Sequence, residues 1–300
     1  MWCRKLSEVS IIPWAYRSGG ATGLWPDHCL MRFDVTKGPN ETTQQTTTER
    51  VVARHRQLAR APIREALIDI QFEPPLPIEL IDRFVSSVES SFSKKTDIWE
   101  AQFGLILGNP SPTPHSMQKA IGRRLDSADG LYVLQCRSTG FTLSRLTPYG
   151  KWSDLRDEAF RLWSALARAV DSLTVTRIAV RYINQIAIPV PFGDFNEYLT
   201  CPPQLPDDVP QALSEFLVRV VIPDPSTRCV SIVTQALEGQ PVETSTGASI
   251  AVLLDIDVFR EGRLESAEME QIWEGVDELR AQKNRLFFAH ITEKAVELYA

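Results

Sequence analysis

The stretch TRIAVRYINQIAIPVP, residues 176–191, carries the strongest β-strand pattern in the chain. It is rich in β-branched residues and closes with two prolines, which is typical of a strand. Because successive side chains of a strand point to opposite faces, Arg177 and Arg181 share one side, and Val180 and Tyr182 lie on the other. The stretch therefore predicts a sheet with one apolar, covered face and one charged face.

Three further segments repeat this alternation. In PIREALIDIQF, residues 62–72, and in SIAVLLDIDVF, residues 249–259, acidic side chains alternate with an apolar series. In FTLSRL, residues 141–146, we include the arginine on the charged side. The sequence thus predicts a single charged face made of Glu65, Asp69, Arg145, Arg177, Arg181, Asp255 and Asp257.

The remaining patterns predict how the sheet is covered. Apolar residues recur every three or four positions over residues 77–92, 151–170 and 266–283, and a similar spacing predicts a helix over 211–221. Residues 131–146 predict a hairpin, residues 228–237 a further strand, and residues 101–107 a short strand in an otherwise loose stretch. We therefore expect an α+β fold, a mostly antiparallel sheet with helices packed on one face, formed as one domain by residues 59–300.

The first 58 residues differ from the rest of the chain. They lack a sustained strand or helix period and include the polar run NETTQQTTTER, residues 40–50. They hold eight basic and five acidic residues, whereas the remainder holds 24 and 33. Residues 1–58 are expected to be a flexible arm or, alternatively, the product of a mis-called gene start, with translation beginning at Met31 or later.

Composition narrows the functional classes. No segment approaches the roughly 20 consecutive apolar residues that a membrane-spanning helix needs. The five cysteines are scattered without a metal-like spacing, which favours reduced thiols and a cytoplasmic protein. The acidic balance after residue 58 makes nonspecific binding to nucleic acid unlikely, because such binding uses a basic surface.

The charged face admits three interpretations. Opposite charges on neighbouring strands can form a self-satisfied ion-pair lattice. Arg177 and Arg181 could instead bind the phosphate or carboxylate of an anionic small molecule, or a protein partner. Asp255 and Asp257, two residues apart, could hold Mg²⁺. The leading hypothesis is a non-catalytic binding or interaction module without a cofactor; the alternative is a metal-dependent enzyme acting on a phosphorylated or nucleotide substrate.

Five stretches also resemble a sporadically distributed family of uncharacterised bacterial proteins. They are RAPIREALIDIQF, GFTLSRLTPYGKW, RIAVRYINQIAIP, LLDIDVF and KNRLFFAHITEKAVELY, in this order between residues 60 and 300. The resemblance implies no established activity, and sporadic occurrence is typical of accessory genes, including stress and phage-defence genes. The family motifs fall here on Glu65, Arg145, Arg181, Asn184, Asp255, Asp257, Asn284 and Thr292.

Overall fold

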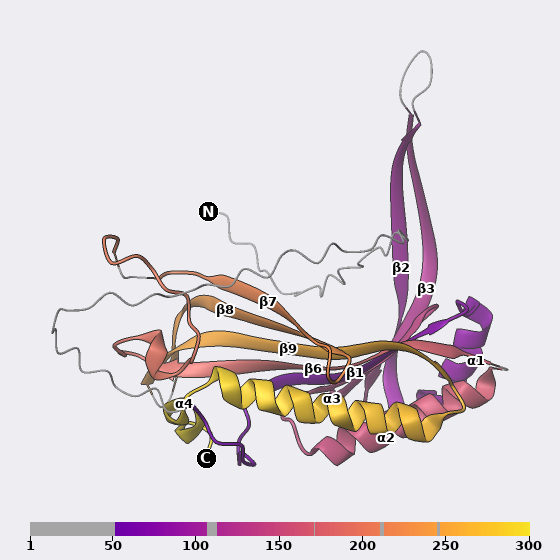
Figure 1. Cartoon of the computed structure of the whole chain (residues 1–300). Coiled ribbons are helices and arrows are strands. Elements are labelled where there is room, and N and C mark those ends of the chain that lie inside the picture. Colours follow the sequence, from indigo (N-terminus) through magenta and orange to yellow (C-terminus); the bar gives the residue numbers. More distant parts are fainter. Residues whose placement is uncertain (1–51, 107–112, 171, 211–212, 245–246) are drawn as a thin grey trace, which may run out of the picture. The chain divides into compact units, whose positions relative to one another are not determined.

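The computed structural model describes residues 52–300, except 107–112, 171, 211–212 and 245–246. Its strands form one antiparallel nine-stranded sheet in the order β2-β3-β4-β5-β1-β6-β9-β8-β7. The fold is α+β, as the sequence predicts (Figure 1). The strands are β1 (Ile63–Glu73), β2 (Phe92–Ile106), β3 (Thr113–Ser127), β4 (Tyr132–Arg137), β5 (Gly140–Leu146), β6 (Thr174–Pro189), β7 (Leu217–Asp224), β8 (Cys229–Thr244) and β9 (Gly247–Glu265).

The described helices are α1 (Ile78–Val88), α2 (Trp152–Ala169), α3 (Met269–His290) and the short α4 (Glu293–Glu297), with 3₁₀ turns η1 (Glu89–Ser91) and η2 (Phe195–Glu197). Figure 1 shows α2 and α3 along one face of the central strands. The register brings fully buried side chains together on this covered face, in a row across six strands: Leu125, Leu134, Leu143, Ile68, Val180 and Val258. The helices bury this row, and the opposite face of the sheet is left to the charged residues.

Helix α3 lies very close to β6 because of a glycine. A Cβ added at Gly275 would come within 2.6 Å of Cδ1 of Ile178, a residue of β6. Only a glycine allows so close an approach without a shift of the neighbouring side chain. The N-terminal half of α3 is thereby held close to the core side chains of β6. Among the described residues, no helix has the length and apolar character needed to cross a membrane.

Two local predictions were wrong. Residues 92–106 and 113–127 form two strands of 15 residues each, β2 and β3, where only a short strand over 101–107 was expected. Residues 217–221, expected as the end of a helix over 211–221, belong to the strand β7. In β7 the run Leu-Val-Arg-Val-Val-Ile consists mainly of β-branched residues, whose strand preference and pairing with β8 outweigh the helix-like spacing before it.

The strands β2 and β3 extend well beyond the sheet. β3 pairs with β4 only from Gly122 to Asp126, whereas its pairing with β2 continues out to Thr113. Figure 1 shows the resulting two-stranded ribbon projecting on the side away from α2 and α3. At the base of the ribbon, a Cβ on Gly122 of β3 would lie 2.4 Å from the carbonyl oxygen of Cys136 in β4. The close approach of β3 and β4 at this point therefore requires glycine.

The predicted arm, residues 1–58, lies outside the described residues up to position 51, as does its alternative start at Met31. Its last residues contact the C-terminal segment. The amide of Ala53 donates to the carbonyl of Ile291 at 3.1 Å, and Arg56 pairs with Glu293 at 2.7 Å. Arg60 continues this contact, donating its amide to the carbonyl of Tyr299 at 3.2 Å. Backbone hydrogen bonds thus tie residues 53–60 to the end of the chain.

Candidate functional site

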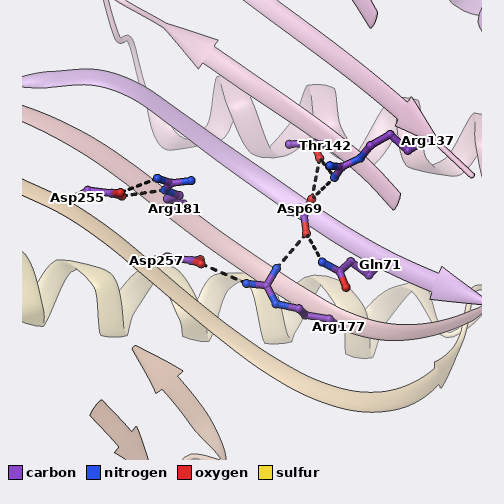
Figure 2. A network of polar contacts seen from close by, with 8 residues as sticks. All are labelled: Asp69, Gln71, Arg137, Thr142, Arg177, Arg181, Asp255 and Asp257. Atoms are coloured by element: carbon purple, nitrogen blue, oxygen red, sulfur yellow. Dashed lines mark hydrogen bonds and ion pairs between the residues drawn. The ribbon is translucent and has the colours of Figure 1, made fainter. Parts of the chain in front are cut away.

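The face of the central strands opposite α2 and α3 carries an ion-pair network, which Figure 2 shows from close by; we call it the uncovered face because no described helix packs on it. Asp69 comes from β1, Arg177 and Arg181 from β6, and Asp255 and Asp257 from β9. Because β1, β6 and β9 are neighbours in the sheet, residues far apart in the sequence meet on one surface. The structure thus brings five of the seven predicted site residues together.

Arg177 is the centre of this network. Its guanidinium pairs with Asp69 at 3.0 Å through Nη1 and with Asp257 at 3.2 Å through Nη2, so it joins β1 to β9. The side chain passes over the ring of Phe259, with Cζ 4.3 Å from the ring centre. Phe259 lies opposite Ala179, two residues along β6 from Arg177. Because Ala179 is small, the face of the Phe259 ring is accessible to the guanidinium, which stacks on it.

Arg181 forms a bidentate pair with Asp255. Its Nε and Nη2 donate to the two carboxylate oxygens of Asp255, at 2.8 and 2.6 Å. The register sets Arg181 directly opposite Asp257, so the bidentate bond runs diagonally across β6 and β9. The hydrogen bonds to Asp255 raise the pKa of Arg181 above its ordinary value, since they stabilise the charged guanidinium.

Three residues of the network are missing from the sequence prediction: Gln71 of β1, whose side-chain amide donates to Asp69 at 3.5 Å, Arg137 and Thr142. Arg137 of β4 pairs with Asp69 at 3.2 Å, and the hydroxyl of Thr142 of β5 donates to the same carboxylate at 2.6 Å. Asp69 and Thr142 are directly opposite in the β1–β5 register, and Gln135 extends this row to β4. The short strand that contains Arg137 shows no alternation of charged residues. Its place in the network follows only from the register between neighbouring strands.

Two predicted residues do not join the network. Glu65 lies on the same face of β1, but it forms no ion pair or hydrogen bond with any described residue. Arg145 is opposite the buried Ala66, so it points to the covered side of β5. The prediction that Arg145 belongs to the charged face was therefore wrong. On the covered side its guanidinium lies 4.7 Å from the centre of the Tyr132 ring. By alternation along β5, Arg145 shares a side with Phe141 and Leu143. In the structure these three residues lie on the covered, apolar side of the strand.

The network is balanced and only partly exposed to solvent. Three arginines face three aspartates, and the exposed fractions of the six side chains range from 11% for Asp69 to 34% for Arg181. Burial raises the pKa of Asp257 above its ordinary value, and the charges of Arg177 and Arg181 oppose this rise. An incoming anion would have to displace a carboxylate from one of these arginines. The geometry therefore favours the self-satisfied lattice over an anion site on this face.

The same contacts bear on the predicted magnesium site. Both oxygens of Asp255 accept hydrogen bonds from Arg181, and one oxygen of Asp257 accepts from Arg177. Among the described residues, no three His, Cys, Asp or Glu side chains converge as metal ligands. Asp255 and Asp257 in this arrangement do not fit a divalent cation, because the cation would have to replace a guanidinium.

Asn184, buried on the covered side of β6, has a structural role. Its side-chain amide donates to the carbonyl of Leu254 at 2.9 Å, across the β6–β9 pair.

Comparison with known proteins adds no relative: no protein-family model and no curated protein matches the chain. The family resemblance of the five motifs therefore stays a prediction, and the function has to be argued from the geometry.

Proposed function

We propose that the chain is a non-catalytic interaction module that adds a β-strand from a second copy of itself to the edge strand β7. The observation that carries the proposal is the exposure of β7. It is the last strand of the sheet, and Leu217, Val220, Val221 and Ile222 are 71, 42, 52 and 37% exposed. Apolar side chains are therefore open to solvent on both faces of one edge strand.

An exposed apolar edge is unusual in a soluble fold. The backbone of β7 pairs with β8, and no other described segment pairs with its outer row of backbone groups. Edge strands are normally protected by charges, prolines or covering segments, because an open edge recruits further strands. Strand addition satisfies these backbone groups and covers the apolar side chains in one step.

The sequence of β7 suits pairing with itself. An antiparallel pair centred on Val221 sets this valine against its own copy across a twofold axis. Val220 then lies opposite Ile222, and Arg219 opposite Pro223, so no like charges are directly opposed. This match favours a second copy over an unrelated strand as the occupant of the edge.

The ion-pair network has a supporting role in this proposal. It links β4, β5, β1, β6 and β9 through side chains, in addition to the backbone ladder, and so stiffens the sheet that presents β7. We place the module in the cytoplasm, in keeping with the free thiols of Cys136, Cys201 and Cys229.

The test is the oligomeric state of the full chain, measured by sedimentation over a wide range of micromolar concentrations. We expect a monomer–dimer equilibrium in the wild type. Val221→Lys places a charge at the centre of the proposed pair and should raise the dimer dissociation constant by about tenfold or more.

The matched control is Met117→Lys, which changes a similarly exposed apolar residue on β3, the neighbour of the opposite end strand β2. This variant should dimerise like the wild type. A wild type that stays monomeric throughout the range, or a dimer that survives Val221→Lys, would overturn the proposal.

A further inference from the structure

Lys283 is a buried amine on the covered side of the sheet. It lies in the interior of α3 and is 5% exposed, and its Nζ lies 3.6 Å above the centre of the Tyr182 ring. It forms no ion pair or hydrogen bond with any described residue. A lysine is almost never buried without a partner, because taking an ammonium out of water is costly.

A second cation lies one turn away. Arg280 is half-buried on α3, its Cζ is 5.4 Å from the ring centre of Trp152, and it makes no ion pair with a described residue. The acid three residues earlier, Asp277, is already engaged: it accepts from Trp152 at 2.8 Å and pairs with Arg156 at 2.9 Å. This junction of α2 and α3 therefore holds unpaired positive charge.

Two tyrosine hydroxyls complete the group. The hydroxyls of Tyr149 and Tyr182 are 2.8 Å apart and share one hydrogen bond. Two hydroxyls carry two protons, so one O–H of the pair is left to donate to a further acceptor. Burial raises the pKa of both tyrosines, which keeps them protonated at neutral pH. We call Tyr149, Tyr182, Arg280 and Lys283 the covered cation site.

Electrostatics point to a missing negative charge. Burial, helped by the positive charge of Arg280, lowers the pKa of Lys283 to about 7. Among the described residues, Tyr182 on β6 lies under the amine, Arg280 on α3 acts on it one turn away, and Tyr149 is hydrogen-bonded to Tyr182. None of these three groups supplies an anion at neutral pH. A bound anion would favour the charged form of Lys283 and pair both cations at once.

We propose that the covered cation site binds a compact oxyanion, of the phosphate or carboxylate class, between Arg280 and Lys283. The guanidinium of Arg280 offers the paired donors that such a group accepts, and a tyrosine hydroxyl offers another. Arg280, Tyr149 and Trp152 are each half-buried, so the ligand reaches Lys283 from their side. Unlike the arginines of the ion-pair network, these cations can bind an anion without losing a carboxylate.

The experiment uses thermal melts of the full chain at about pH 6, with millimolar sulfate as the probe and sodium chloride at equal ionic strength as the reference. Sulfate keeps the same charge across the pH range, so changes in its effect report on the protein. We expect sulfate to raise the melting midpoint more than chloride does. The extra shift should be lost in Lys283→Met and reduced in Arg280→Gln.

Lys294→Met is the matched control, because Lys294 also lies over a tyrosine ring, 4.9 Å from the centre of Tyr198, but is exposed and paired with Glu197. It should keep the full sulfate shift. The shift should also shrink at about pH 8.5, where Lys283 loses its proton. Parallel melts with phosphate and acetate decide between a tetrahedral and a planar oxyanion. Equal shifts with sulfate and chloride, or a sulfate shift that survives Lys283→Met, would overturn the proposal.

Discussion

The two faces of β6 treat positive charge in opposite ways. On the uncovered face, Arg177 and Arg181 are still partly exposed, yet each is paired with at least one aspartate. On the covered face, Lys283 is almost completely buried over Tyr182 and has no carboxylate partner among the described residues. The paired charges of the uncovered face can be explained by their structural role alone. The buried, unpaired Lys283 instead suggests that a ligand supplies the missing negative charge.

The largest expected effect tests the covered face. Lys283 has a folded pKa of about 7 against an ordinary 10.5, so between these values the unfolded chain binds more protons and wild-type stability rises with pH. Lys283→Met removes the cost of burying the ammonium. We expect it to increase the free energy of unfolding by on the order of 4 kcal/mol below pH 7, and by little near pH 10. Urea unfolding at several pH values measures this.

Lys294→Met provides the comparison for that series, since its ammonium is exposed. It should change stability by less than about 1 kcal/mol at every pH. If Lys283→Met instead lowers stability at pH 6, the ammonium is held by favourable contacts, and the contrast between the two faces of β6 breaks down.

A second expected effect tests whether the uncovered face is a lattice. Asp69 accepts from Arg137, Arg177 and Thr142, so Asp69→Asn leaves two half-buried guanidiniums without their shared carboxylate. We expect a loss of about 3 kcal/mol in the free energy of unfolding, measured by urea titration. Asp126→Asn, which breaks the more exposed pair with Arg124, should cost less than about 1 kcal/mol. Equal costs in the two variants would argue against a lattice.

The smallest expected effect concerns Asp257. Burial raises its pKa, so the folded chain takes up this proton more readily than the unfolded chain, and ionised Asp257 costs stability as pH rises through that window. Asp257→Asn relieves this cost but removes one acceptor from Arg177, which keeps Asp69. We expect the two effects to offset each other to within about 1 kcal/mol at neutral pH. A larger loss would show that Arg177 depends on Asp257 more than on Asp69.

Much of the fold can be predicted from the sequence, because its central strands and helices show clear periods. The helix over 151–170 and the strands that form β1, β6 and β9 have apolar series on one side only. The strands β2 and β3 lack this signal, since a ribbon that projects from the sheet has no covered face to pattern its residues. β7 was missed for a related reason: as an edge strand it is apolar on both faces.

The candidate site divides in the same way. Within one strand, alternation places Arg177, Arg181, Asp255 and Asp257 correctly on one face. Arg137 depends on the register between three strands, which a single sequence does not specify. Lys283 was predicted to be the last residue of its helix, where a lysine is an ordinary favourable cation. Because α3 continues to His290, the same residue lies in the interior of the helix and is buried.

The projecting ribbon gives the molecule a second, weaker folding unit. Outside Gly122–Asp126 each of its strands has a single hydrogen-bonded neighbour among the described strands, and a lone two-stranded ribbon is only marginally stable in water. Its backbone should therefore open locally while the central strands stay intact, so that its amide hydrogens exchange with deuterium well before those of β6. Although β3 is one continuous strand, its residues before Gly122 should exchange their amide hydrogens faster than those from Gly122 onward, which also pair with β4.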